Sequence, residues 1–461
     1  EIFEQSQHKL WNLKLSKFIP PFIVRVEELE KDITLILSLI ETFVEAEKIL
    51  LQVKDVMAAY SIKRQVPTEY RVLCEMVEFW SEVISQIQAD PRIYNLKEQQ
   101  QLTNGIKDMI IALNGIKTTF VPFFNCRRSE CPRLNFFSNE DLFSLLASKT
   151  AEHILPFVQF LYPNVAKIDS GLKRDGSLNI MKIVTFDGET VPYPQTKQKE
   201  PVEVIVATLG EILHKHVIDQ IINCLQNLRK TQKFEKIQKD YSWQSYDVAR
   251  KIQTTTEVTK ILDNHKGEDQ NKCLVNLLKK IDEIILKIQS SISAGTANKR
   301  TRLKLYNNLN TEFWLKISIC QMQRFQANNQ VDSCQTLLEW LRFFKFSYVK
   351  AKNEIVINHG YQTHVYGCES LKLMDPIIWQ PYFPNIFLQM SSTSTTNRFV
   401  FLTGTPGDGK TTCMKFYSHL LGKYHYKVQF LENSFSALLI EDLFKVLTHG
   451  PFVIQVNLTS C

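Results

Sequence analysis

The residues with the clearest potential for chemistry form one short loop near the end of the 461-residue chain. Residues 404–411, GTPGDGKT, match the pattern G-x-x-x-x-G-K-[ST], which in other proteins cradles nucleotide phosphates. Glycines let backbone N–H groups point into an anion hole, and the helix that follows adds its positive N-terminal end. Lys410 would reach the terminal phosphates as a point charge, and Thr411 would offer its hydroxyl to Mg²⁺.

The segments on either side of this loop have the character that a phosphate-binding loop requires. Phe399 to Thr403 form an apolar run of strand length, and the stretch after the loop has a helical pattern. We therefore predict binding of ATP and Mg²⁺, with Thr411 as the metal ligand. The predicted nucleotide-binding residues are Gly404, Thr405, Pro406, Gly407, Asp408, Gly409, Lys410, Thr411 and Thr412. The alternative is a glycine-rich turn that holds no nucleotide.

Hydrolysis of a nucleotide needs more than a phosphate cradle. A strand that ends in aspartate usually helps to hold the metal, and an acid after it polarises the attacking water. The next candidate strand, PFVIQVNLTSC at residues 451–461, contains no carboxylate. Asn457 offers a neutral oxygen at most, and Leu458 cannot act on water. The sequence thus favours nucleotide binding over turnover by this segment, and it assigns no catalytic residue.

Long amphipathic helices are predicted for most of the chain before the loop. Their apolar residues recur at steps of three and four positions, which is typical of helices that bury one side. The stretches with this pattern are 24–57, 68–87, 96–120, 202–230, 273–292 and 334–346. We expect antiparallel helices of a bundle or rod, with Trp80 in its core rather than in a ligand site.

One β-hairpin is predicted within this helical region. Residues 182–194, KIVTFDGETVPYP, alternate apolar and polar positions on both sides of Asp187-Gly188, and this dipeptide is a strong hairpin signal. After about Ile355 the sequence becomes rich in aromatic residues, glycine and proline, which predicts a connector of turns or short strands. The fold class is therefore mainly α, with the start of an α/β segment at the loop.

Composition and charge narrow the choice of partners. The net charge is +7, from 55 basic and 48 acidic residues, which falls short of a nucleic-acid-binding surface. The basic cluster NKRTRLKLY, which begins at Asn298, is interpreted as a solvated helix start, with contact to an acidic neighbour as the alternative.

Cysteine and histidine usage predicts no metal site beyond the loop. Ten cysteines are spread singly, and the Cys126–Cys131 pair lacks the second ligand pair that a zinc site would need, so reduced thiols are expected. His214 and His216 have no carboxylate cluster around them and are interpreted as surface residues.

No secretory signal opens the chain, and we expect no apolar run of the ~18 residues that span a bilayer. An intracellular segment of a longer protein is the expected class.

Several landmarks occur in a fixed order before the loop. They are VPTEY at 66–70, CPRLNFFSNEDLFSLLA at 131–147, FDGETVPY at 186–193, TTTEV at 254–258, LEWLRFFKF at 338–346 and VYGCESL at 365–371. In this order and spacing they resemble the linker and the first AAA+ module of dynein heavy chains, over most of residues 45–461.

This resemblance implies an elongated helical-bundle linker over residues 1–354 with its hairpin near 182–194, a connector over 355–398 and a partial P-loop AAA+ domain over 399–461. The linker would act as a lever on the AAA+ ring in ATP-dependent, microtubule-based movement. The implied partners are microtubules, through regions outside this chain, and dynein intermediate and light chains, with no membrane or nucleic acid. The implied location is the cytoplasm and cytoskeleton, in the axoneme of a cilium or flagellum.

The chain also departs from the dynein pattern. The family's first loop reads Gly-Pro-Ala-Gly-Thr-Gly-Lys-Thr, whereas Thr405, Pro406 and Asp408 differ here, and the family's Asp-Glu falls near Asn457 and Leu458. Such divergence resembles an outlying type of heavy chain more than an ordinary motor chain. One alternative is therefore a non-hydrolysing structural scaffold subunit of an axonemal complex. Another is an unrelated helical protein with a signalling-type NTPase domain.

Overall fold

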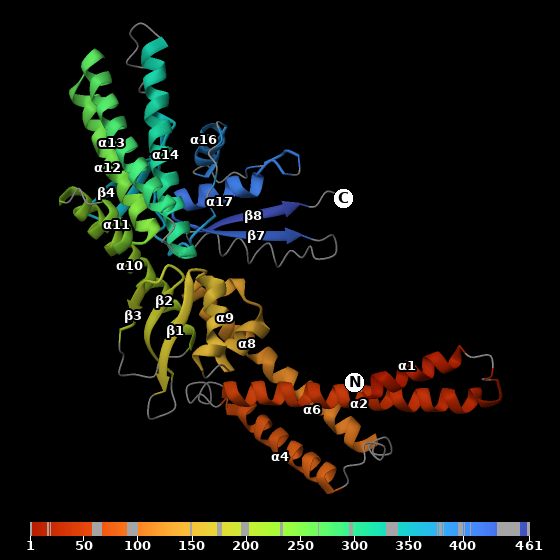
Figure 1. The fold of residues 1–461 in the computed structure, drawn as a ribbon. Coiled ribbons are helices and arrows are strands. Elements are labelled where there is room, and N and C mark those ends of the chain that lie inside the picture. The colour runs from red at the N-terminus through yellow and green to blue at the C-terminus, as the bar shows by residue number, and fades with distance from the viewer. Residues whose placement is uncertain are drawn as a thin grey trace. The chain divides into compact units, whose positions relative to one another are not determined.

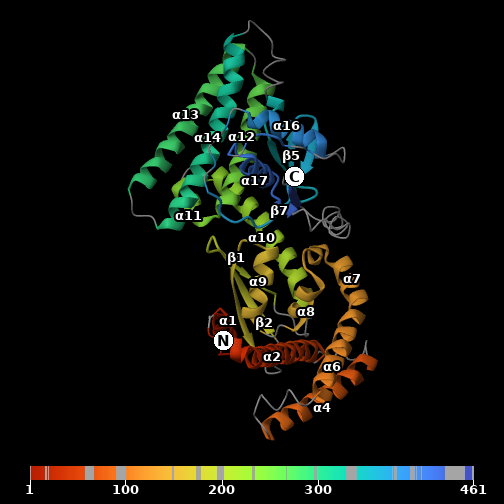
Figure 2. The ribbon, with the colours of Figure 1, turned by 90° about the vertical axis from the view of Figure 1, so that its right-hand side faces the viewer.

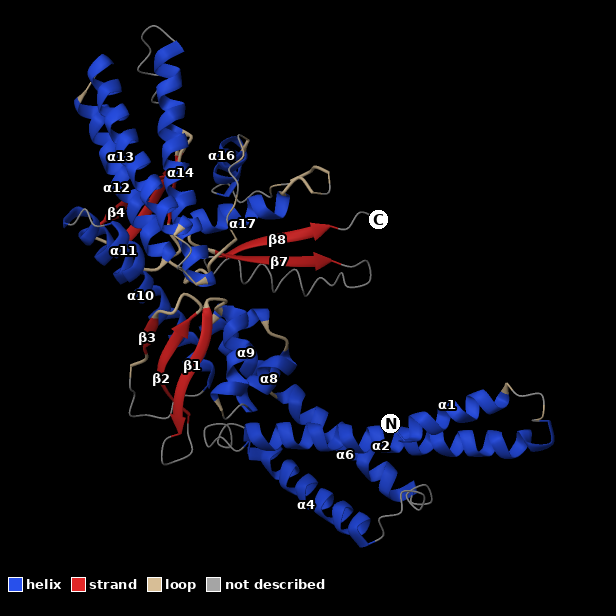
Figure 3. Cartoon of the chain, in the orientation of Figure 1, coloured by secondary structure: helices blue, strands red, loops and turns tan. Residues whose placement is uncertain are grey.

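Helices make up most of the chain in its computed structural model, which confirms the predicted mainly α fold (Figure 3). The chain forms two compact units, Glu1–Lys149 and Thr150–Cys461. The domain boundaries predicted at 355 and 399 lie inside the second unit and stay predictions. The structure describes residues 2–15, 18, 20–57, 67–89, 100–147, 150–172, 178–194, 202–230, 234–265, 267–294, 298–328, 340–375, 377, 380, 382–394, 400, 402–405, 407–430 and 452–458.

The first unit is built from α-helices, and each of them after the first contributes buried side chains. They are α1 (Ile2–Lys14), α2 (Ile23–Met57), α4 (Pro67–Ala89), α6 (Gln100–Thr119), α7 (Val121–Glu130) and α8 (Asn139–Ala147). Pro67 opens α4, where its fixed φ suits the first helical turn. Trp80 is 6% exposed and its ring lies 4.5 Å from that of Phe43, so its predicted place in the core is confirmed.

The landmark at residues 131–147 is held by local hydrogen bonds. Ser138 and Asp141 form a reciprocal capping box, in which each backbone N–H donates to the other side chain at 3.1 Å, and this bonding starts α8. Arg128 donates to the Phe137 carbonyl at 2.7 Å and to Asn139 Oδ1 at 2.8 Å. The sequence landmark is therefore a structural joint between α7 and α8.

One helical stretch among the described residues, Leu102–Glu130, is long and apolar enough to cross a membrane by length and composition. The expectation that no stretch would reach this length was wrong. The stretch covers α6 and α7, and α6 packs against α2 with Met109 and Leu113 almost fully buried. The core of the first unit therefore accounts for the apolar residues on that side.

The second unit begins with α9 (Ala151–Leu161) and a three-stranded antiparallel sheet. Its strands β1 (Val165–Leu172), β2 (Leu178–Thr185) and β3 (Thr190–Pro192) lie in the order β1-β2-β3. Ile183 pairs with Val191 on either side of the turn, and Gly188 adopts a left-handed φ of 83°. The hairpin predicted from Asp187-Gly188 is confirmed, because glycine supplies the backbone conformation that this tight turn needs.

A helical body follows this sheet. It contains α10 (Val202–Lys230), α11 (Phe234–Asp240), α12 (Trp243–Asn264), α13 (Gly267–Ser293) and α14 (Lys299–Asn328). Figures 1 and 2 both show α13 and α14 side by side. Arg250 on α12 and Glu312 on α14 form a buried two-bond ion pair at 2.7 and 2.8 Å, and the Tyr246 hydroxyl donates to the same carboxylate at 2.8 Å.

The basic cluster at the start of α14 has some residues exposed to solvent and others that interact with the rest of the chain. Arg302 is exposed, as predicted for a solvated helix start. Arg300, however, donates to the Thr185 carbonyl at 3.1 Å, and Lys304 lies in the field of Asp187 and Glu189 at the hairpin turn. Acidic side chains of the same chain therefore lie near the cluster, although Arg300 bonds to a carbonyl oxygen rather than to a carboxylate.

A second antiparallel sheet corrects one prediction. The described part of the predicted helix at 334–346 is helical at residues 340–341, but Lys345 and Phe346 belong to β4 (Lys345–Val349). β4 pairs with β5 (Glu354–His359), which pairs with β6 (Gln362–Val365). Strand pairing overrides the helical spacing here because it buries Phe346, Ile355 and Ile357 together. The short strands predicted after about Ile355 are confirmed.

The last elements are α16 (Phe383–Ser394), α17 (Lys410–Leu420), β7 (Tyr424–Phe430) and β8 (Phe452–Leu458). β7 and β8 are parallel, with Tyr424 opposite Phe452 and Phe430 opposite Leu458, so the strand predicted in 451–461 is confirmed. The strand predicted over 399–403 is not formed at Val400, Leu402 or Thr403. Phe399 and Phe401 lie outside the described residues, as does Pro406 of the loop.

Candidate phosphate-binding loop

The glycine-rich loop leads directly into α17. Gly407 and Gly409 have left-handed φ angles of 93° and 77°, which glycine adopts without strain. Gly409 is the N-cap residue of α17 and has no side chain to accept from the first helical N–H groups, and the first turn contains no acidic residue. The Gly409 carbonyl accepts from Cys413 N–H at 2.8 Å, which starts the helix. The N-terminal end of α17 therefore remains positive, as an anion site requires.

Lys410 folds back over the loop. Its ammonium donates to the carbonyls of Gly404 at 2.8 Å and Thr405 at 2.6 Å. The sequence predicts that this ammonium contacts terminal phosphates, and that contact stays a prediction; in the structure the ammonium lies against carbonyls of the loop. Its bonds are to exposed carbonyl groups, so an anion could replace them at little cost.

Asp408 closes the same loop from the other side. Its two carboxylate oxygens accept from Thr405 N–H at 2.6 Å and Thr405 Oγ1 at 2.7 Å. These two hydrogen bonds hold the pKa of Asp408 below its usual value, so the carboxylate is charged at neutral pH. Tyr382 donates to the Asp408 carbonyl at 3.4 Å. A negative charge therefore lies within a loop whose sequence predicts phosphate binding, a feature that the motif alone did not reveal.

The far side of α17 is fixed by a buried chain of polar and aromatic contacts. Tyr417 Oη lies 3.3 Å from Ser391 Oγ, which lies 2.6 Å from His359 Nδ1. His359 stacks on Phe344 with ring centres 3.9 Å apart. Burial lowers the pKa of His359 to about 4, so its ring is neutral at physiological pH. The exposed loop therefore leads into a helix, α17, whose far side is held by buried contacts, and we call this side the rigid base of α17.

A clamp joins α17 to the helical body and was missed from the sequence. Gln244 on α12 donates to Tyr366 Oη at 3.0 Å and to the Glu369 carbonyl at 2.7 Å, and its own oxygen accepts from Leu371 N–H at 3.0 Å. The same turn reaches the end of α17, where Gly422 accepts from Glu369 N–H at 3.1 Å. No local signal could reveal Gln244, since its partners lie more than 120 positions away.

The carboxylates that would complete a hydrolytic site are absent from β8. This strand carries Asn457 and Leu458 at its end, opposite Gln429 and Phe430 of β7. In the part of the chain that the structure describes, no group of three histidine, cysteine or acidic side chains could hold a metal ion. The geometry offers an uncapped helix start and one ammonium, which suit anion binding, and the sequence places the hydroxyl-bearing Thr411 and Thr412 in the first turn of α17.

The fold defines a mainly helical protein that leads into a short α/β segment with a glycine-rich loop. The sequence profile of the family "Dynein heavy chain, N-terminal region 2" matches residues 1–228. The chain is 24% identical over 431 residues to dynein axonemal heavy chain 2 of Mus musculus. It is 21% identical over 433 residues to dynein-1-beta heavy chain, flagellar inner arm I1 complex, of Chlamydomonas reinhardtii.

A further relative is dynein axonemal heavy chain 10 of Homo sapiens, which is 20% identical over 441 residues. Each of these three alignments covers 92% of this chain but 9% of the relative's length. The chain is a divergent dynein heavy chain N-terminal region.

Proposed function

We propose that this chain is the linker and the start of the first AAA+ module of a dynein-like heavy chain, and that residues 404–412 bind ATP with Mg²⁺. The observation that carries the proposal is the loop geometry. Two left-handed glycines lead into an uncapped helix start, and the Lys410 ammonium lies against the loop carbonyls. The rigid base of α17 supports the same conclusion, because a phosphate cradle must be held in place to bind.

Titration of the 461-residue chain with a fluorescent ATP analogue in the presence of Mg²⁺ tests this proposal. Lys410→Ala removes a charge-assisted contact, which corresponds to an affinity loss of about tenfold or more. Lys415→Ala is the matched control, because Lys415 is exposed on the same helix. Equal affinities for the two variants would refute the assignment of Lys410.

The proposed role of the whole protein is ATP-dependent, microtubule-based movement in the axoneme of a cilium or flagellum. The linker would act as a lever on the ring, with microtubules bound through other regions and with dynein intermediate and light chains as partners. The axonemal and flagellar names of the relatives support this location. The Gln244 clamp supports the lever, since it bonds α12 to the turn at residues 366–371, and Glu369 of that turn donates to the Gly422 carbonyl just after α17.

A second candidate is a non-hydrolysing scaffold subunit of an axonemal complex. The observation that favours it is the end of β8, where Asn457 and Leu458 replace the acids that metal binding and water activation require. ATPase assays on a longer protein that contains the rest of the ring, with and without microtubules, distinguish the two roles. Microtubule-stimulated turnover that is lost in Lys410→Ala would reject the scaffold.

A further inference from the structure

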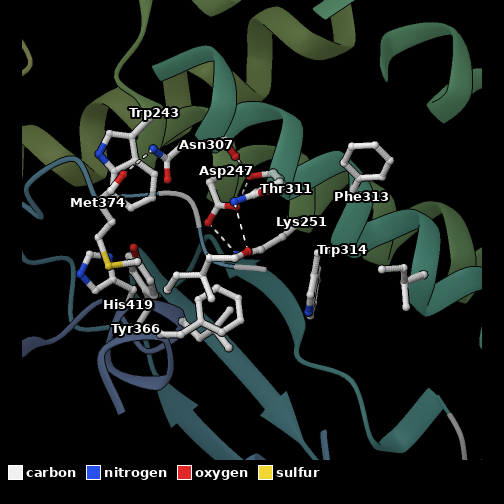
Figure 4. Close-up of a pocket in the computed structure, with 15 residues that line it drawn as sticks. Trp243, Asp247, Lys251, Asn307, Thr311, Phe313, Trp314, Tyr366, Met374 and His419 are labelled. Carbon is white, nitrogen blue, oxygen red and sulfur yellow. Dashed lines mark hydrogen bonds and ion pairs between the residues drawn. The ribbon is translucent and has the colours of Figure 1, made fainter. Parts of the chain in front are cut away.

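A cavity of about 370 Å³ lies beside α17, separate from its glycine-rich loop. Its wall combines one face of α12 with one face of α14, the connector after β6 and the last turn of α17 (Figure 4). The α17 part, Phe416 to Leu420, begins six residues after Lys410, roughly 9 Å along a helix axis. A volume of this size is at the lower end of the range for small-molecule sites.

Aromatic rings form opposite sides of this cavity. Figure 4 shows Trp243 and His419 on one side and Phe313 and Trp314 on the other. Trp243 and His419 are stacked with their ring centres 5.8 Å apart. Burial lowers the pKa of His419 to about 3, so this ring is neutral at physiological pH. Flat apolar surfaces of this kind favour a planar aromatic ligand.

The charged groups in the wall neutralise one another. Lys251 and Asp247 form an ion pair at 2.6 Å, and Thr311 donates to the other Asp247 oxygen at 2.6 Å. The Lys251 ammonium also lies over the Trp314 ring, 5.2 Å from its centre. Because these charges are already compensated, the wall provides no net charge to hold an ionic ligand. It favours an uncharged one.

Asn307 supplies a directed polar group. Its side chain is 8% exposed, and its Nδ2 donates to the carbonyls of Leu303 at 3.0 Å and Met374 at 2.8 Å. These bonds fix the orientation of the amide, so Oδ1 is left as an acceptor, and none of the described residues donates to it. Asn307 Oδ1 is not among the fully buried unpaired atoms of the described residues, so it is accessible from the cavity and can accept from the donor of a bound molecule.

We propose that this cavity binds a small, uncharged aromatic amine, with its flat rings between the aromatic sides and its N–H donating to Asn307 Oδ1. The ligand braces the last turn of α17 against α12 and α14. The site is independent of the nucleotide proposal, because no residue of the glycine-rich loop belongs to its wall.

Fluorescence titration of the 461-residue chain with N-phenyl-1-naphthylamine tests the site. This probe is an uncharged aromatic amine in which one N–H group joins two flat ring systems, and we expect saturable binding of one molecule per chain. Asn310→Phe and Ile317→Phe fill the cavity from α14 and should weaken binding at least about tenfold, as loss of most of the buried contact area implies. Tyr306→Phe changes an exposed residue of α14 outside the wall and should leave binding unchanged.

Competition with 1-benzylnaphthalene, in which a methylene replaces the N–H group, tests the hydrogen bond. We expect it to bind about fivefold more weakly than the amine, and Asn307→Leu should abolish this difference. Circular dichroism checks that each variant is folded. Non-saturable binding, or filling variants that are folded and bind as wild type does, would overturn the site. Equal affinities of the two probes for the wild-type chain would overturn the role of Asn307.

Discussion

Arg250 with Glu312, and Lys410 with Asp408, are two charged clusters in the same unit with opposite relations to solvent. The first is buried, with exposures of 4% and 0%, and its members bond to each other. In the second, Lys410 and Asp408 bond instead to the exposed backbone and hydroxyl of the loop. The comparison shows that charged side chains stabilise a fold where water is excluded. Where water is present, similar side chains can exchange their hydrogen-bond partners for water or a ligand.

The largest expected effect is on the buried pair. Glu312→Gln leaves the Arg250 guanidinium buried without its counter-charge and should lower the free energy of unfolding by about 3–5 kcal/mol. Urea unfolding followed by circular dichroism measures this change. The double variant Arg250→Met with Glu312→Leu should recover most of the loss, because no charge then remains buried. A loss below 1 kcal/mol in Glu312→Gln would contradict the contrast with the loop.

Asp187 is partly buried, so it is intermediate in burial between the Arg250–Glu312 pair and the exposed loop. Burial, and then the charge of Glu189, raise the pKa of Asp187 to about 6, above its usual value near 4. The folded state therefore binds more protons than the unfolded state between about pH 4 and 6, and stability falls as pH rises through that window. Asp187→Asn should reduce this loss by about 1–2 kcal/mol. Unfolding free energies measured at pH 4.5 and 7.5 in roughly matched salt would show it, and parallel pH profiles for both chains would argue against it.

Asp408 should produce a smaller effect, on ligand affinity rather than stability. Asp408→Asn keeps an acceptor for Thr405 but removes the negative charge near the proposed phosphate position. Nucleotide affinity should rise about fivefold, since a charge pair in water contributes about 1 kcal/mol at contact distance. The measurement is the ATP-analogue titration at low and high salt, where the gain should shrink as salt rises. Weaker binding in Asp408→Asn would show that the carboxylate supports the site.

The smallest effect is expected for an ion pair at the surface. Lys316 and Asp282 lie 2.6 Å apart, but their side chains are 35% and 44% exposed. Lys316→Ala should change the unfolding free energy by less than about 1 kcal/mol, because water screens the pair. The same urea experiment measures it. A change as large as that of Glu312→Gln would show that burial does not control these interactions.

Much of the fold was predictable because its signals are local. The Asp187-Gly188 turn, the amphipathic helices and the core position of Trp80 follow from backbone preference and periodicity within a few residues. The predicted helix at 334–346 failed at Lys345, because pairing with β5 decides that segment. The strand expected before the loop is not formed at Val400, Leu402 or Thr403, where the apolar pattern alone did not produce a pairing partner.

The candidate site also has some features that follow from local sequence and others that depend on contacts between distant segments. The sequence by itself determined the glycine-rich loop, its lysine and the lack of acids in the last strand, because these depend on residue type and short spacing. Tertiary structure alone decided that Asp408 closes the loop, that Gln244 clamps α12 to a turn 122–127 positions away, and that α12, α14 and α17 enclose a cavity. Contacts between distant segments arise from burial and complementary shape, which no short stretch of sequence encodes.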